Sequence, residues 1–271
     1  MASVHPKAWL GEGVCIGPFA VIGEHTCIGA GTNVGPHVVL EGWTTLGEAC
    51  EISAGAVLGG APQDLKYRGQ RSFLRIGDHT RIGEYVTIHR SAQEDGMTVI
   101  GAHNFLMACT HVAHDCKLGD HVVMVNYAGL SGHVEVEDRA FISGHNAVHQ
   151  FVRIGYLAFV SGCSRVVKDV PPFMLAQGNP TRIRGLNVVG MRRAGLEPTA
   201  RMELRRAFRL LYRSSLNTTQ ALQRIQQEHW TSREVQRLIA FIEGSKRGIC
   251  AGSRPSERTV ASPDEGIDED A

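Results

Sequence analysis

The chain has 271 residues, with 28 lysines and arginines against 27 aspartates and glutamates. This near balance gives no sign of a nucleic-acid partner, and no apolar stretch approaches the ~18 residues that a membrane span requires. The 31 glycines and the low aromatic content of 6% instead predict many tight turns between small, branched side chains.

The seven cysteines are odd in number, and no two of them have C-x-x-C spacing. Both features argue against a disulfide framework and against a thiolate zinc site. The start of the chain has no charged segment followed by an apolar core, as a signal peptide would. We therefore expect a reducing compartment, the cytoplasm, and no stable membrane insertion.

One aliphatic residue recurs every six positions. Stepping by six from Val4 to Val166 visits 28 positions, and 25 of them hold Val, Leu, Ile or Met; the exceptions are Asp64, Gln70 and Glu94. A column of small residues lies four positions after the aliphatic one. Glycine often follows the aliphatic residue directly, where we expect it to supply turn conformations. The period fits neither an amphipathic helix nor a simple array of hairpins.

A period of six suits short strands joined by corners, with one aliphatic side chain per strand pointing inward, as in a parallel β-helix. With three flat faces, one coil takes about 18 residues, so residues 18 apart in sequence stack on one another. The three exceptions fall in the stretches 60–75 and 89–99, after which the period returns in phase. We predict that these stretches are inserted loops, and such loops often mark the binding face.

The period ends at Val166, and a proline-containing connection follows. We predict a β-helix over residues 1–180, a small α-helical C-terminal domain over 181–250, and a disordered tail over 251–271 that is polar and acidic at its end.

The first long helix of this domain is expected to begin at Pro198, because proline suits the first turn. An apolar stripe formed by Leu204, Phe208 and Leu211 would face its core. Gly244 is expected to end the last helix.

Histidines from three successive coils come together under the 18-residue stacking rule. The stacked sets are His114 with Gly132 and Gln150, Asp115 with His133, and Ser131 with His149. The clustered histidines are therefore His111, His114, His133 and His149. Five other histidines are more simply explained as surface residues of the β-helix without a functional role: His25, His37, His79, His121 and His145.

This cluster has the parts of an acyl-transfer site. A neutral imidazole such as that of His114 can take a proton from a hydroxyl nucleophile. A glycine stacked on it, Gly132, would leave its backbone N–H open to a developing oxyanion. Strand alternation by itself does not predict a direct contact between His114 and Asp115.

Several stretches of the chain resemble a known family. They are "QDLKY" (63–67), "VTIHR" (86–90), "HVAHDC" (111–116), "GHV" (132–134), "AVHQF" (147–151), "DVPPF" (169–173), "AQGN" (176–179) and "GLNVVGMRRAG" (185–195). Together they identify the chain as similar to the UDP-N-acetylglucosamine O-acyltransferases, a family of hexapeptide-repeat acyltransferases. The resemblance covers roughly residues 1 to 250 and implies an all-β left-handed parallel β-helix; the spacing does not give that hand.

The resemblance also implies an activity. The family transfers a 3-hydroxyacyl chain from acyl carrier protein to the 3-hydroxyl of UDP-N-acetylglucosamine, the first step of lipid A biosynthesis. It implies a homotrimer whose sites lie between two subunits, and it implies no cofactor and no bound metal, because the donor carries its acyl chain on the carrier's phosphopantetheine.

The resemblance implies a role for each matching residue. His114 would be the general base, Asp115 its support and Gly132 the oxyanion donor. The residues implied to bind substrate are His111, His133, His149, Gln150, the loop residues Gln63, Asp64 and Lys66, and the nucleotide contacts Gln177, Asn187 and Arg193. Gly162 would help set acyl length, and a glycine there would leave room for a longer chain.

The chain departs from the family pattern at Val189, where an acidic residue is usual, and at Ala194, where a second arginine is usual. These departures leave open an acceptor sugar with a 3-amino group. Four arginines recur every four residues, and on a helix they would line one face. They are a candidate docking surface for the acidic carrier protein, as opposed to a merely solvated face: Arg201, Arg205, Arg209 and Arg213.

Two other readings compete with acyl transfer. Three of the clustered histidines could hold a zinc ion with an open fourth position, as in γ-class carbonic anhydrases, which share this prism. That reading would leave the inserted loops and the basic helix without a role. A non-catalytic scaffold would use only the flat faces and would tolerate replacement of all four histidines.

Overall fold

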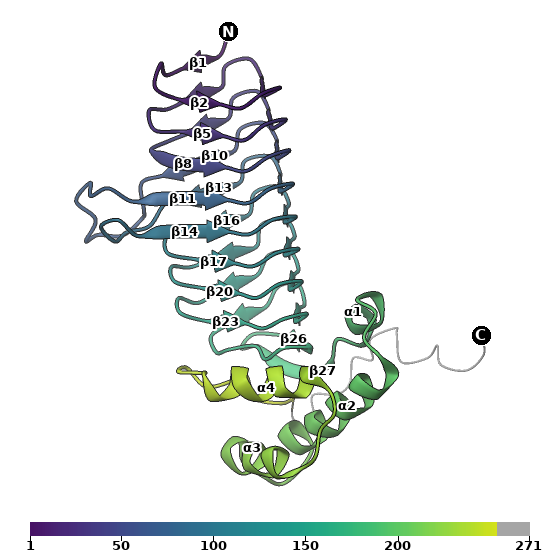
Figure 1. The fold of residues 1–271 in the computed structure, drawn as a ribbon. Coiled ribbons are helices and arrows are strands. Elements are labelled where there is room, and N and C mark those ends of the chain that lie inside the picture. The colour runs from purple at the N-terminus through teal and green to yellow at the C-terminus, as the bar shows by residue number, and fades with distance from the viewer. Residues whose placement is uncertain (254–271) are drawn as a thin grey trace.

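The computed structural model describes residues 1–253. The chain winds into a long three-faced prism of parallel strands, and four helices gather at its C-terminal end (Figure 1). Among the described helices, none has both the length and the apolar character needed to cross a membrane.

Each face of the prism is one parallel sheet. The first face contains β1 (Ser3–Val4), β4 (Val21–Ile22), β7 (Val39–Leu40), β10 (Val57–Gly60), β13 (Thr87–His89), β16 (His111–Val112), β19 (Gly129–Leu130), β22 (Ala147–Val148) and β25 (Arg165–Val166). The second contains β2 (Trp9–Leu10), β5 (Cys27–Ile28), β8 (Trp43–Leu46), β11 (Phe73–Ile76), β14 (Met97–Ile100), β17 (Lys117–Leu118), β20 (Glu135–Val136) and β23 (Arg153–Ile154). The third contains β3 (Cys15–Ile16), β6 (Asn33–Val34), β9 (Glu51–Ile52), β12 (Arg81–Ile82), β15 (Phe105–Leu106), β18 (Val123–Met124), β21 (Phe141–Ile142), β24 (Phe159–Val160), β26 (Met174–Gln177) and the antiparallel β27 (Arg182–Leu186).

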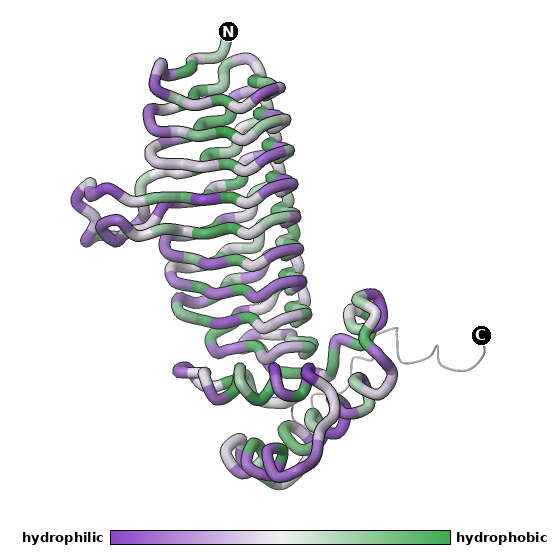
Figure 2. The backbone as a smooth tube through the Cα atoms, in the orientation of Figure 1, coloured by the Kyte–Doolittle hydropathy of each residue, from purple (hydrophilic) through white to green (hydrophobic). Residues whose placement is uncertain are grey.

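The strand register confirms the stacking rule. His111 pairs with Gly129, and Gly129 pairs with Ala147, at steps of 18 residues. The step widens where the loops leave the coil: Trp43 pairs with Phe73, and Phe73 pairs with Met97. Both loops connect a strand of the first face to a strand of the second, so they leave the prism at the same corner. They project beside β11 and β14 and are largely hydrophilic (Figures 1 and 2).

The repeating aliphatic residues fill the interior of the prism. From Ile22 to Val166 the inward column is buried. At the open N-terminal end, where no coil lies above, Val4 and Leu10 stay 40% and 39% exposed. Burial of one aliphatic side chain per strand is the main stabilising contribution of each coil.

The glycines after the aliphatic column serve a different purpose from the expected one. A Cβ on Gly29 would lie 2.4 Å from the Gly47 carbonyl carbon, and one on Gly77 would lie 2.7 Å from that of Gly101. These glycines therefore allow adjacent coils to approach closely. The left-handed turn conformation falls two residues later, mostly on residues other than glycine.

Seven histidines occupy these left-handed corner positions: His25, His37, His79, His103, His121, His133 and His145. Histidine adopts this region more readily than most side chains. The rings also stack from coil to coil: His79 and His103, and then His103 and His121, have ring centroids 4.9 Å apart. Most of the repeated histidines are therefore explained by turn geometry and stacking.

This explanation predicts unequal effects of two substitutions at His103, whose φ is 57°. Both His103→Asn and His103→Val remove the stacked ring, but only asparagine tolerates the left-handed region. We expect the valine variant to be less stable by a further ~1–2 kcal/mol. Urea unfolding of both variants tests this, and equal stabilities would contradict it.

The C-terminal helices close the lower end of the prism. They are α1 (Val188–Arg193), α2 (Pro198–Tyr212), α3 (Thr218–Gln227) and α4 (Arg233–Glu243). α4 lies directly beneath the last coil (Figure 1), where Arg237 stacks on Tyr156 at 4.0 Å and Arg153 stacks on Phe241 at 4.3 Å.

The helical expectations hold for the two longer segments. Pro198 opens α2, its predicted apolar stripe is buried, and Gly244 caps α4. The strand β27 and the short helix α1 were not anticipated, because an antiparallel return to β26 has no signal in the six-residue period.

The predicted tail also begins later than expected. Gly252 bridges to Ile183, and the Ser253 N–H donates to the Ile183 carbonyl at 3.0 Å, so residues 251–253 pair with β27. Disorder from residue 251 is therefore wrong for these three residues. The remainder of the predicted tail lies outside the described residues.

Candidate active site

The first and second faces meet at the corner formed by residues 113–116, 131–134 and 149–152, which we call the histidine corner. Both inserted loops leave the prism at this corner, one and two coils earlier. The histidines that the stacking rule grouped lie on this corner or on the strand ends beside it. The predicted gathering of side chains from distant parts of the sequence is therefore present.

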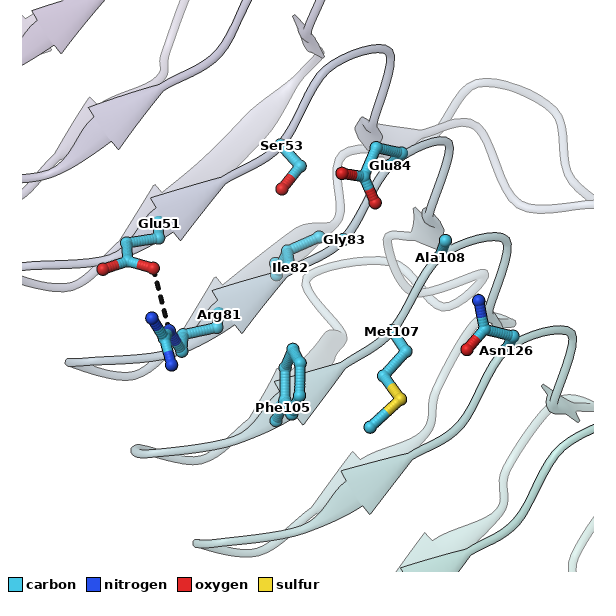
Figure 3. A pocket seen from close by; sticks show the side chains of 10 residues that line it. All are labelled: Glu51, Ser53, Arg81, Ile82, Gly83, Glu84, Phe105, Met107, Ala108 and Asn126. Atoms are coloured by element: carbon cyan, nitrogen blue, oxygen red, sulfur yellow. Dashed lines mark hydrogen bonds and ion pairs between the residues drawn. The ribbon is translucent and has the colours of Figure 1, made fainter.

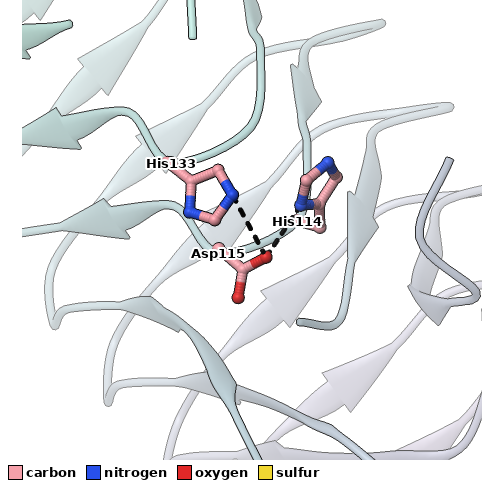
Figure 4. Close-up of side chains that lie close together, drawn as sticks. All are labelled: His114, Asp115 and His133. Carbon is pink, nitrogen blue, oxygen red and sulfur yellow. Dashed lines mark hydrogen bonds and ion pairs between the residues drawn. The ribbon is translucent and has the colours of Figure 1, made fainter. Parts of the chain in front are cut away.

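A carboxylate lies between two imidazoles at this corner (Figure 4), and a hydroxyl also donates to it. His114 Nδ1 lies 2.8 Å from Asp115 Oδ2, and His133 Nε2 lies 3.8 Å from the same oxygen. The Ser91 hydroxyl donates to Asp115 Oδ1, and the Ala92 N–H donates to Oδ2 at 3.2 Å. Asp115 thus holds the His114 ring in one orientation and is itself held by the second inserted loop.

The contact between neighbours His114 and Asp115 depends on the corner. Asp115 has a φ of 60°, in the left-handed region, so the two residues do not alternate as they would along a strand. The Asp115 N–H donates to the Thr98 hydroxyl at 2.8 Å, which holds this turn. The turn brings the carboxylate round to the imidazole.

The environment of Asp115 favours its charged form. Burial raises the pKa of the carboxyl, but the hydrogen bonds from Ser91, His114 and Ala92 together outweigh burial, and the pKa is lowered overall. An ionised Asp115 accepts the His114 Nδ1–H and so leaves the lone pair of Nε2 available as a base.

Gly132 lies directly against the His114 ring. A Cβ at this position would be 2.6 Å from His114 Cε1 and 2.8 Å from Nε2. Only glycine therefore permits the observed ring position. The close packing also sets the Gly132 backbone beside Nε2, the atom that faces away from Asp115.

The Gly132 N–H has no acceptor among the described residues. The equivalent N–H groups at another corner of the prism point outward, and carboxylates accept them: Asp78 Oδ1 from Glu48 at 2.8 Å and Asp120 Oδ1 from Ala102 at 2.7 Å. This position of the coil therefore presents its N–H to an anion outside the backbone. At Gly132 that donor is available to an oxyanion.

His111 and His89 form a drier layer next to the site. His111 Nδ1 bonds the Thr87 hydroxyl at 2.7 Å, and its ring meets that of His89 edge to face at 5.1 Å. Burial lowers the pKa of His111, and burial together with the neighbouring histidines lowers the pKa of His89 to about 4. Both rings are therefore neutral near pH 7.

The remaining histidines of the corner are more open. His133 stacks on Phe151 with ring centroids 4.5 Å apart and is 31% exposed at its side chain. His149 and Gln150 are exposed, and His149 Nδ1 lies 3.1 Å from the Gln150 carbonyl oxygen. These side chains could contact a substrate that reaches His114.

The loop residues implied by the resemblance lie away from the base within this chain. Gln63 and Lys66 are exposed on the first inserted loop, and Asp64 accepts a hydrogen bond from the Lys66 N–H at 2.8 Å. Leu65, between them, is 96% exposed. None of the hydrogen bonds or ion pairs among residues 1–253 joins these side chains to the histidine corner.

The predicted nucleotide residues lie at the lower end of the prism. Gln177 ends β26, and Arg193 is exposed at the end of α1. The Asn187 side chain caps α1 through the Gly190 N–H and donates to the Leu157 carbonyl at 2.9 Å, so it already has a structural role. Gly162 lies on the corner between the third and first faces, apart from His114.

A separate open cavity of about 390 Å³ lies on the third face and includes Glu51, Arg81, Phe105 and Met107 (Figure 3). No residue that the sequence predicted for the site lines it. The histidine corner lies elsewhere on the prism, between the first and second faces.

Sequence reasoning missed the residues that hold Asp115. Ser91 and Ala92 lie in the second inserted loop, where the step between stacked residues is 24 instead of 18, as in the pairing of Thr87 with His111. Applying that longer step would have placed Ser91 beneath Asp115. His89 has a weaker signal, because its burial depends on how the loop folds back.

Known proteins resemble the chain over most of its length. Residues 169–250 match the model described as UDP-N-acetylglucosamine O-acyltransferase, domain 2. The acyl-[acyl-carrier-protein]–UDP-N-acetylglucosamine O-acyltransferase of Gloeothece citriformis is 50% identical over 195 residues, which are 72% of this chain and 70% of the relative. The protein of the same name from Burkholderia mallei is 43% identical over 199 residues, 72% of this chain and 76% of its own.

The chain belongs to the UDP-N-acetylglucosamine O-acyltransferase family. The solved UDP-N-acetylglucosamine acyltransferase of Bacteroides fragilis superposes with a TM-score of 0.89 at 36% identity, covering 91% of this chain and 97% of its own. The solved structure from Acinetobacter baumannii superposes with a TM-score of 0.88 at 40% identity, over 92% of this chain and 97% of that one. Membership confirms the resemblance, the left-handed parallel β-helix and an acyltransferase activity.

The packing of His114 on Gly132 predicts the effect of adding one methyl group. Gly132→Ala would push the imidazole away from its position, and we expect kcat to fall by at least about 100-fold with the fold retained. Gly129→Ala is the matched control for folding, because a Cβ there meets nothing closer than 3.9 Å. Circular dichroism and acyl-transfer rates measure the two effects; near-normal activity of Gly132→Ala would contradict the assignment.

The low pKa of His89 predicts acid sensitivity. The unfolded chain takes up a proton at this residue below pH ~6.5, whereas the folded chain does so only near pH 4. Stability from this residue is therefore complete above pH 6.5 and is lost as the pH falls from 6.5 to 4, by roughly 3 kcal/mol. Urea unfolding of the wild type should show this loss in the free energy of unfolding, and the loss in His89→Gln should be smaller by the same roughly 3 kcal/mol. An identical dependence of the free energy of unfolding on pH in the two proteins would contradict the prediction.

Proposed function

We propose that the protein transfers a 3-hydroxyacyl chain from acyl carrier protein to the 3-hydroxyl of UDP-N-acetylglucosamine, the first step of lipid A biosynthesis, with His114 as the general base. The observation that carries the base assignment is the set formed by Asp115, His114 and Gly132. In this set the Asp115 carboxylate and a backbone N–H without a described acceptor lie beside one imidazole. The names of the matched relatives support the donor and the acceptor.

The proposed reaction uses these three groups in sequence. His114 Nε2 takes the proton of the sugar hydroxyl as its oxygen attacks the thioester carbonyl carbon. The Gly132 N–H donates to the oxyanion that forms. When the carbon–sulfur bond breaks, the imidazolium returns the proton to the carrier's sulfur. Asp115 keeps Nδ1 protonated and stabilises the positive ring.

This chemistry needs no cofactor, and we propose that none is used. The ligand atoms of His114, Asp115 and His133 do lie within 4.8 Å of one another, so the corner could hold a metal ion. However, both Asp115 oxygens already accept hydrogen bonds: Oδ1 from the Ser91 hydroxyl, and Oδ2 from the His114 ring and the Ala92 N–H. Elemental analysis of the purified protein separates a zinc hydratase from the acyltransferase.

We propose that the protein works as a homotrimer. Within one chain, Gly162 and the exposed Leu65 lie apart from His114, on a different corner and on a projecting loop. The third face carries partly exposed apolar side chains such as Phe105 and the stacked pair Phe141 and Phe159, whose ring centroids are 5.0 Å apart. A threefold assembly would cover this face and could bring these elements to a neighbour's histidine corner.

We propose the arginines of α2 as the surface that receives acyl carrier protein. Arg205, Arg209 and Arg213 are exposed and line one pocket, whereas Arg201 is half-buried and does not line it. The proposed surface includes all four arginines of the predicted stripe, of which Arg201 is the least exposed. A positive surface accelerates encounter with an acidic partner. We place the reaction in the cytoplasm, where the seven free cysteines would remain reduced.

The base assignment predicts a large and specific loss. We expect His114→Ala to lower kcat by about 10²- to 10⁴-fold without loss of the fold. His121→Ala is the control, since His121 stacks on His103 at another corner, and its kcat should change less than about twofold. The assay supplies 3-hydroxyacyl carrier protein and UDP-N-acetylglucosamine; a His114 variant with near-normal kcat would reject the base.

Val189 and Ala194 depart from the family pattern and leave open whether the acceptor sugar carries a 3-hydroxyl or a 3-amino group. The same assay, repeated with the 3-amino form of the sugar, separates these two acceptors. Faster transfer to the amino sugar would move the assignment to that acceptor while leaving the base in place.

Charge reversal tests the docking surface. Arg205→Glu should raise the KM for acyl carrier protein by about tenfold or more and weaken its salt dependence, because it removes one attraction and adds a repulsion. The KM for UDP-N-acetylglucosamine should stay constant. Arg139→Glu, on an exposed corner of the prism, is the control; an unchanged kcat/KM for the carrier in Arg205→Glu would reject docking at α2.

A further inference from the structure

A small pocket beside α2 combines an apolar floor with a basic rim. Its floor is formed by Leu186, Val188 and Phe208, and its rim by three arginines; we call it the arginine pocket, with residues Leu186, Val188, Arg205, Phe208, Arg209 and Arg213. Its volume is about 250 Å³. Such a lining suits an apolar side chain flanked by carboxylates.

Two arginines of this rim lack acidic neighbours. Among residues 1–253, no carboxylate lies within ion-pair distance of Arg205 or Arg209, and both are exposed. By contrast, Arg206 on the same helix pairs with Glu228 at 2.8 Å. Arg205 and Arg209 therefore carry positive charge that no carboxylate among residues 1–253 pairs with.

The chain itself carries a segment of the complementary chemistry. Its last eight residues, "DEGIDEDA" (264–271), hold five acidic side chains, no lysine or arginine, and one large apolar residue, Ile267. Acidic residues stand on both sides of the isoleucine. The segment thus matches the pocket in charge and in the position of its single apolar side chain.

The described chain ends close to the pocket. A Cβ on Gly252 would lie 3.2 Å from Tyr212 Cδ1, and Arg182 Nη1 donates to the Gly252 carbonyl at 3.3 Å. Tyr212 directly precedes Arg213, and β27, which pairs with Gly252, ends at the pocket residue Leu186. The C-terminal segment therefore starts at one end of the arginine pocket.

The distance is short for the length of chain available. Ten residues lie between Ser253 and Asp264, so the eleven Cα-to-Cα steps that join them can span up to ~36 Å when extended. The rim from Arg213 to Arg205 covers eight helical residues, or ~12 Å. The acidic segment can therefore reach any part of the rim, at the high effective concentration of a tethered ligand.

We infer that residues 264–270 dock in the arginine pocket of their own chain, with Ile267 on the apolar floor and the flanking carboxylates on Arg205 and Arg209. The segment then occupies the surface proposed for acyl carrier protein and competes with it. The docking itself is independent of the proposed function; only the competition rests on it.

Cross-linking tests the docking without any assay of activity. In the Arg209→Lys variant of the full chain, a carbodiimide should join the new amine to the carboxylates of residues 264–270, as read by mass spectrometry of the digested protein. Arg139→Lys is the control and should give no such product. No cross-link in the first variant, or equal cross-links in both, would overturn the docking.

Unfolding a mixture of isotopically heavy and light chains and refolding them together, so that any oligomer contains both, shows which chain supplies the segment. Cross-linked pairs of a single isotope support docking on the same chain. Mixed pairs at the statistical frequency would instead assign the segment to a neighbouring copy and overturn this inference.

Kinetics test the competition. Neutralising the segment in the full chain, by Asp264→Asn, Glu265→Gln, Asp268→Asn, Glu269→Gln and Asp270→Asn together, should lower the KM for acyl carrier protein at least about threefold, with kcat and the KM for the sugar nucleotide unchanged. Glu12→Gln with Glu41→Gln is the control for loss of surface charge. An unchanged KM for the carrier would overturn the competition, while a lack of any transfer to UDP-N-acetylglucosamine would overturn the proposed function and leave the cross-link result standing.

Discussion

The backbone hydrogen bonds between successive coils are the constraint on which the rest of the molecule depends. Each coil donates to and accepts from its neighbours at a step of 18 residues, or of 24 and 30 where the two loops leave the prism, so a residue's place on a corner follows from its number once the loops are known. The His133 N–H donates to the His114 carbonyl at 3.0 Å, and the Phe151 N–H donates to that of Gly132 at 3.2 Å. Without this ladder, the imidazoles and the glycine would belong to unrelated parts of the chain.

The corners of the prism have one geometry and two uses. The left-handed residue at each corner turns its side chain outward, where it stacks on the coil above, and a column such as His79, His103 and His121 results. At the histidine corner the same geometry turns Asp115 toward His114, and the Gly132 N–H has no acceptor among the described residues. The site therefore arises from ordinary coil geometry, with a carboxylate and a glycine placed where other corners carry rings or larger residues.

Electrostatics at the histidine corner depend on the inserted loops. A carboxylate that is 11% exposed would tend to take up a proton, and the hydroxyl of Ser91 and the N–H of Ala92 offset that tendency. His89 and His111, in the drier layer beside it, stay neutral. The second inserted loop thus has a direct role in the chemistry of the base, because it supplies the hydrogen bonds that keep Asp115 charged.

The sequence by itself determined the prism, its three faces and the gathering of His114, Asp115, Gly132 and His133, because a strict period converts sequence distance into position. It also indicated both inserted loops and the apolar face of α2. It could not reveal the contact between His114 and Asp115, which requires a left-handed turn, nor the support from Ser91, which requires the altered step at a loop. The partial burial of Arg201, and the return of residues 251–253 to β27, were likewise decided only by tertiary packing, since neither follows from any repeat in the chain.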